Sequence, residues 1–95
     1  MIKVVAQFFL KDGDVEKALE LAEKLVAETR KESGCHQYDL FQNAERVTHI
    51  TFIEEWENQA ALDAHFQAPH FVELVPELQA LTDREAVITS YNKIM

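Results

Sequence analysis

The sequence predicts an α+β fold in which strands and helices follow one another in the order β-α-β-β-α-β. Two patterns support this order. Four segments are rich in β-branched and aromatic residues, and apolar residues recur at helical spacing after the first strand and after the third. Length adds a third observation, because 95 residues build one small core. We therefore expect a single domain over residues 1–95.

The first strand is predicted over residues 2–10, IKVVAQFFL, where apolar residues occupy both alternations. KDGD is typical of a turn, and apolar residues then recur at helical spacing from Val15 to Glu32. Gly34 is placed to end this helix in a left-handed conformation. HQYDLFQN and VTHITFIEEW predict a hairpin around Asn43–Arg46.

Asn58 is a suitable cap for a short helix whose apolar face carries His65. Pro69 either ends this helix or begins the next one, and HFVELVPELQAL resumes helical spacing. REAVITSYNKI is the last predicted strand. This order is that of the ferredoxin-like fold with an antiparallel sheet. One layer of helices covers only one face of such a sheet, so we expect a second copy to cover the other face in a homodimer.

Composition limits the partners. The chain has 17 acidic against 9 basic residues, and its longest basic run is the pair Arg30–Lys31. Nucleic acid and anionic membrane surfaces are therefore not expected as partners. The single cysteine, Cys35, cannot form an intramolecular disulfide and points to a cytoplasmic protein. No apolar stretch approaches the roughly 20 residues of a membrane helix.

The segment EEWENQAALDAHFQAPHF holds the candidate functional residues. Strand alternation puts Glu54 and Trp56 on one face and Glu55 on the other. If the hairpin closes tightly at Ala44–Glu45, Asp39 shares the face of Glu54 and Tyr38 lies on the opposite face. A change of one residue in register would exchange these two.

His65 should face the sheet, so Asp39, Glu54, Trp56 and His65 are predicted to line one apolar space. Two carboxylates and an imidazole in such a space suit proton transfer on a small polar or aromatic molecule. The alternative is structural: His65 as a core histidine with its hydrogen bonds satisfied and Glu54 at a strand end on the surface.

A metal site is not expected from the sequence. His65 and His70 are separated by Pro69 and lack the i, i+4 spacing of a helical metal pair. Tyr38 could hydrogen-bond a ligand or simply pack, and Cys35 is expected to be a free structural thiol. There is no phosphate-binding glycine loop and no dinucleotide fingerprint, so no cofactor is expected.

Four motifs carry a resemblance that covers essentially the whole chain. They are Glu32-Ser33-Gly34-Cys35, Tyr38-Asp39, Glu54-Glu55-Trp56, and Ala64-His65 with Pro69-His70-Phe71. Together they resemble the antibiotic biosynthesis monooxygenase-like family of dimeric α+β barrels. The family's haem-degrading relatives differ at the positions of His65 and Val75, so haem is not expected here.

The resemblance implies a cofactor-independent monooxygenase acting on a quinol-like or related enolisable aromatic molecule. The candidate catalytic residues are His65, Glu54 and Asp39, which also match the residues of the relative that processes phosphorylated autoinducer-2. The candidate substrate-binding residues are Trp56, Phe52, Phe66, His70, Phe71 and Tyr38. A ketose-phosphate isomerase of the kind that processes phosphorylated autoinducer-2 is an alternative, which the scarcity of basic residues near the motifs weakens. A non-catalytic dimer that binds a small metabolite or serves in a stress response is another, because fold constrains function weakly.

Overall fold

The computed structural model describes residues 1–95 and confirms the predicted α+β fold. Four strands form one antiparallel sheet in the order β2-β3-β1-β4, and three helices pack on it. The elements are β1 Ile2–Phe9, α1 Val15–Thr29, β2 Cys35–Gln42, β3 His49–Trp56, α2 Gln59–Gln67, α3 Pro69–Gln79 and β4 Val87–Asn92.

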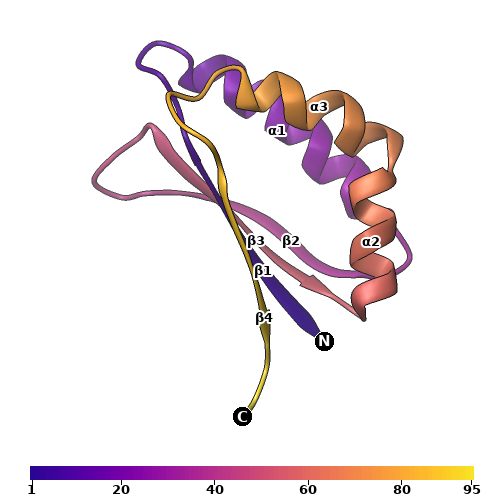
Figure 1. Cartoon of the computed structure of the whole chain (residues 1–95). Helices are drawn as coiled ribbons and strands as arrows, with labels where there is room; N and C mark the ends of the chain where they lie inside the picture. Colours follow the sequence, from indigo (N-terminus) through magenta and orange to yellow (C-terminus); the bar gives the residue numbers. More distant parts are fainter.

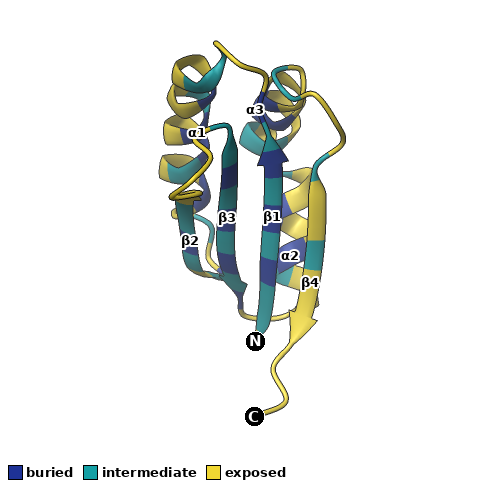
Figure 2. Ribbon diagram, turned by 90° about the vertical axis from the view of Figure 1, so that its left-hand side faces the viewer, coloured by how far each residue is buried: buried dark blue, intermediate teal, exposed yellow.

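All three helices lie on one face of the sheet, with α1 and α3 side by side and α2 at one end (Figure 1). Residues of β1 and β3 are alternately buried and intermediate, whereas β4 is mostly exposed (Figure 2). Their buried positions face the helices and form the core with the apolar faces of α1 and α3. The other face of the sheet carries no helix, as predicted for one layer of helices.

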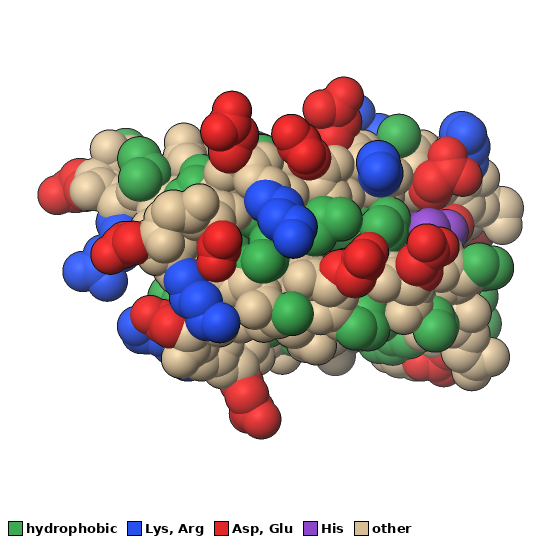
Figure 3. Space-filling view, turned by 90° about the horizontal axis from the view of Figure 1, so that it is seen from above, with side chains coloured by type: hydrophobic (Ala, Val, Ile, Leu, Met, Phe, Trp, Pro, Cys, Tyr) green, Lys and Arg blue, Asp and Glu red, His purple; other side chains and the backbone are tan.

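The outer surface mixes charges of both signs. Acidic and basic side chains are interspersed with apolar ones on the face seen in Figure 3. No helix combines the length and the apolar character needed to cross a membrane.

Helix α1 ends at Thr29, with Arg30 at its C-cap, and therefore stops short of the predicted end at Glu32. The prediction of a left-handed Gly34 is wrong, because Gly13 is the residue with positive φ, at 89°. Gly34 is needed for close packing instead, since a Cβ there would overlap that of Ala61 in α2. Because α1 ends early, Glu32 lies in the loop between α1 and β2, which packs against α2 at Gly34.

The tight hairpin at Ala44–Glu45 is also wrong, because the loop between β2 and β3 spans residues 43–48. The Asn43 side chain organises this loop by accepting hydrogen bonds from the backbone N–H groups of Glu45 and Arg46, at 2.9 and 3.1 Å. Tyr38 consequently pairs with Glu54, and Asp39 pairs with Ile53. The register differs from the predicted one by an odd number of residues, which exchanges the faces of Tyr38 and Asp39.

The junction between α2 and α3 settles the role left open for Pro69. Asn58 caps α2 as predicted, its side chain accepting from the backbone N–H of Ala61 at 2.9 Å. Ala68 is extended, at φ −65° and ψ 142°, as the residue before a proline tends to be. Pro69 then begins α3. His65 and His70 therefore lie on two different helices that meet at a corner.

Candidate functional site

A small cavity lies between the sheet and the layer of helices, where residues of all three helices meet strands β1 and β3. Its free volume is about 10 Å³, the space of about one water molecule. Most of its lining is apolar, with two ionisable groups other than tyrosine, Glu54 and His65. The lining residues are Val4, Ala6, Phe8, Leu25, Tyr38, Phe52, Glu54, His65, Phe66, Phe71, Val75 and Ile88.

Helix α2 directs His65 at the sheet, as its apolar spacing predicted. The side chain is 1% exposed. Its ring lies 4.5 Å from that of Trp56, centroid to centroid, and meets Tyr38 and Phe71 edge-on. Aromatic side chains thus exclude water from the imidazole and hold its orientation.

Glu32 fixes that orientation further. Its Oε2 lies 2.7 Å from Nδ1 of His65 and also 2.7 Å from Nε2 of His70. A carboxylate only accepts hydrogen bonds, so each imidazole donates one N–H to it. Glu32 therefore ties the corner between α2 and α3 to the loop after α1.

The protonation state of His65 follows from this contact. Burial lowers the pKa of His65 below its ordinary value of 6.5 and outweighs the opposing hydrogen bond and charge of Glu32. The ring is therefore neutral at pH 7. Since its single proton sits on Nδ1, facing Glu32, its Nε2 keeps a free lone pair. No protein group hydrogen-bonds to Nε2, and His65 lines the cavity.

Glu54 lies on the same face, as predicted, and is 4% exposed. Trp56 donates its indole Nε1–H to Oε1 of Glu54 at 2.9 Å. Burial raises the pKa of Glu54 from 4.5 to about 7, although the hydrogen bond from Trp56 lowers it. Near neutral pH this carboxyl is thus close to half protonated and can give or take a proton.

The other predicted site residues fall into two groups. Phe52, Phe66, Phe71 and Tyr38 line the cavity, and burial raises the pKa of the Tyr38 hydroxyl, which stays protonated. Trp56 and His70 do not line the cavity. Trp56 donates a hydrogen bond to Glu54, and His70 donates one to Glu32, which also holds His65.

The placement of Asp39 beside Glu54 is wrong. The observed register puts Asp39 on the sheet face that carries no helix, where it accepts from Arg30 at 2.9 Å and from Gln37 at 3.0 Å. The two acidic groups closest to the imidazoles and the cavity are Glu32 and Glu54. Glu32 was missed as a site residue, although it begins the Glu-x-Gly-Cys motif, because the apolar spacing placed it in the helix.

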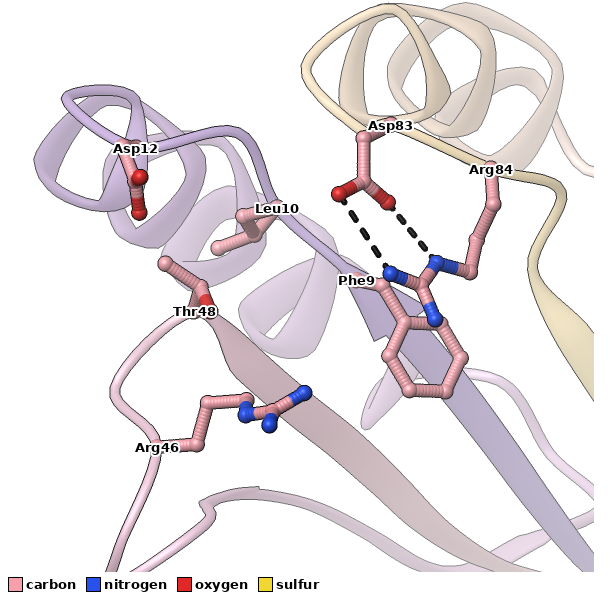
Figure 4. A pocket seen from close by; sticks show the side chains of 7 residues that line it. All are labelled: Phe9, Leu10, Asp12, Arg46, Thr48, Asp83 and Arg84. Carbon is pink, nitrogen blue, oxygen red and sulfur yellow. Dashed lines mark hydrogen bonds and ion pairs between the residues drawn. The ribbon is translucent and has the colours of Figure 1, made fainter.

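A larger groove of about 330 Å³ lies where β1 ends and β3 begins (Figure 4). Asp83 pairs with Arg84 there, with Arg84 Nε 2.8 Å from Asp83 Oδ1, and the Arg84 guanidinium lies 4.7 Å from the centre of the Phe9 ring. Arg46 borders the groove from the β2–β3 loop. Its two carboxylates, Asp12 and Asp83, are exposed, unlike Glu54 in the cavity.

Comparison with known proteins identifies the family. A family model described as antibiotic biosynthesis monooxygenase matches residues 1–77. The chain therefore belongs to the antibiotic biosynthesis monooxygenase family, and this membership supports a general monooxygenase-like role.

Individual relatives agree with this family. The chain is similar to "Uncharacterized protein sll1783" of Synechocystis, at 32% identity over 95% of this chain, and it spans 61% of that relative's length. It is 34% identical to "Probable quinol monooxygenase YgiN" of Escherichia coli, over 74% of this chain and 77% of that one. A crystal structure described as an antibiotic biosynthesis monooxygenase superposes with a TM-score of 0.96 at 38% identity, covering 100% of both chains.

Proposed function

We propose that the chain, as a single domain over residues 1–95, is a cofactor-independent monooxygenase that oxidises a quinol-like or related enolisable aromatic molecule. The observation that carries this proposal is the neutral His65, with Nδ1–H held by Glu32 and Nε2 free beside an apolar cavity. The name of the Escherichia coli relative favours a quinol as substrate class.

The proposed reaction begins with Nε2 of His65 taking a proton from a hydroxyl of the bound substrate. The ring carbon beside the resulting oxyanion is electron-rich and forms a C–O bond to O₂, which is reduced to a peroxide. Loss of the hydrogen on that carbon and cleavage of the O–O bond give a carbonyl and one water. One oxygen atom of O₂ enters the product and the other leaves as water, so the substrate supplies all the electrons.

Glu54 supplies the second proton-transfer group. With a pKa of about 7, part of the Glu54 population is protonated at neutral pH and can donate to the peroxide as its O–O bond breaks. The apolar lining strengthens both contacts because few water molecules compete for them.

Substrate binding requires the cavity to enlarge, since its free volume holds about one water molecule. Phe66 and Ile88, which are 38% and 43% exposed, form the part of its wall nearest to solvent. Movement of these side chains would admit an aromatic ring and bring it against His65.

Oxygen consumption with a panel of hydroquinones tests the proposal. We expect uptake with at least one of them and a product that contains one atom from ¹⁸O₂. Absence of uptake with every hydroquinone would contradict the monooxygenase. Turnover of a ketose phosphate, followed by NMR, would favour the isomerase instead, although no lysine or arginine lines the cavity to bind a phosphate.

We further propose that two copies pair through the sheet face without helices. This face carries Val5 and Ile53 side by side at its centre, with Tyr91, 52% exposed, towards its edge. Light scattering after gel filtration should give a dimer at micromolar concentration, and Ile53→Lys should give a folded monomer. A monomeric wild-type chain would contradict the dimer.

A further inference from the structure

Glu32, His65 and His70 bring three potential metal ligands together from three segments. Glu32 comes from the loop after α1, His65 from the last turn of α2 and His70 from the first turn of α3. One oxygen and two nitrogens of these side chains lie within 4.8 Å of one another. The sequence did not predict this group, because Pro69 separates the two histidines and Glu32 is distant along the chain.

The donor set suits a borderline divalent cation. Two neutral imidazoles and one carboxylate are the ligands that Zn²⁺ takes in open sites, where a water molecule fills the fourth position. Ligand atoms around tetrahedral Zn²⁺ stand about 3.3 Å apart, given bonds of about 2.0 Å. Glu32 Oε2 is now 2.7 Å from each nitrogen, and the three atoms lie within 4.8 Å of one another, so small shifts of all three side chains would be needed to admit the ion.

Access and charge also agree with a cation site. The side chains of Glu32 and His70 are 16% and 17% exposed, so the group borders solvent on one side, while His65 is enclosed. No lysine or arginine hydrogen-bonds to Glu32, and the chain has a net charge of −8. The ion would be drawn to an anionic ligand with no competing cation bound to it.

We propose that Glu32, His65 and His70 bind one Zn²⁺ ion, and that this ion inhibits the monooxygenase. The metal replaces the two N–H···O hydrogen bonds with three metal–ligand bonds. A neutral imidazole carries one proton, so metal on Nδ1 of His65 moves that proton to Nε2. The nitrogen that served as the base then becomes a donor, and substrate deprotonation stops. The inhibitory part of the proposal depends on the proposed function, whereas the binding part does not.

Calorimetric titration of the metal-free chain with Zn²⁺ tests the binding, and visible absorption on adding Co²⁺ reports the ligand geometry. We expect one equivalent bound by the wild type. His70→Ala and Glu32→Gln should each weaken binding by about 100-fold or more, because each removes a ligand. Glu32→Gln preserves side-chain shape, so it tests the site even if His70→Ala unfolds. His36→Ala is the matched control, since His36 is exposed and lies near Glu57, at 3.7 Å, outside the group.

Two results would overturn the site. One is equal Zn²⁺ affinity in the wild type and both ligand variants. The other is no binding by the wild type at a Zn²⁺ concentration of about 1 mM, where even weak binding is seen. Oxygen uptake separates the two proposals. We expect activity to fall in proportion to the Zn²⁺ bound at this site. If Zn²⁺ binds but an active chain is not inhibited, the metal site stands and the role of His65 as the base is contradicted.

Discussion

The exposed groove at the end of β1 and the buried cavity beneath the helices both contain carboxylates and basic side chains, but their surroundings shift the pKa values of these groups in opposite directions. In the exposed groove, the mutual hydrogen bond lowers the pKa of Asp83 and raises that of Arg84, so both stay charged. In the buried cavity, desolvation raises the pKa of Glu54 and lowers that of His65. Burial therefore favours the neutral forms of both groups, and a neutral imidazole or a carboxyl with a pKa near 7 can exchange protons with a substrate.

The largest expected effect is the loss of activity in His65→Ala. Removing the base should lower the rate of oxygen uptake by about 100-fold or more, in line with the usual contribution of general base catalysis. His36→Ala, an exposed histidine on β2, should keep the wild-type rate. Retained activity in His65→Ala would place the chemistry elsewhere.

Glu54→Gln should change how stability depends on pH. The folded-state pKa of about 7 lies above the ordinary value of 4.5, so the folded chain holds this proton more tightly than the unfolded chain. The corresponding stability is fully present below pH 4.5 and is lost as pH rises to about 7, by about 3 kcal/mol in total.

The glutamine side chain introduced by this substitution cannot ionise. The contribution of Glu54 to the pH dependence of the unfolding free energy should therefore disappear in the variant, while the contributions of the other groups remain. Urea unfolding of both chains at about pH 4.5, 6 and 8 measures the difference. Parallel stability profiles for wild type and variant over this range would contradict the burial argument for Glu54.

Gly34→Ala should destabilise the chain by about 1–3 kcal/mol, the usual cost of forcing atoms into a filled space. The new methyl would meet Cβ of Ala61 and push α2 away from the loop that carries Glu32. Ala61→Gly removes the atom that it meets, so the double variant should recover part of the loss. If the two substitutions act additively in urea unfolding, the close packing of α2 on this loop is contradicted.

The smallest expected effect lies in the groove. Arg84→Ala removes an ion pair between exposed side chains, where solvent screens the attraction. The urea midpoint and the oxygen uptake rate should both match those of the wild type. A large loss of activity would mean that the groove, rather than the cavity, takes part in the reaction.

The sequence predicted the elements and the placement of part of the candidate site. Strand alternation and helical spacing act over a few residues, and they placed Glu54, Trp56 and His65 on the covered face correctly. The hairpin register depended on side-chain hydrogen bonds of Asn43 within a longer loop, so Asp39 was assigned to the wrong face. Glu32 reaches His65 and His70 through contacts between segments distant along the chain, which residue spacing does not encode.

The proposed chemistry depends most on Glu32 holding His65 as a neutral imidazole protonated on Nδ1, with Nε2 free as the base. Two-dimensional ¹H–¹⁵N spectra of the histidine rings report the tautomer and charge directly. At pH 7 we expect a neutral His65 ring with its proton on Nδ1, and Glu32→Gln should alter that signal while leaving His36 unchanged. A positively charged His65 at pH 7, or a neutral ring protonated on Nε2, would contradict this role.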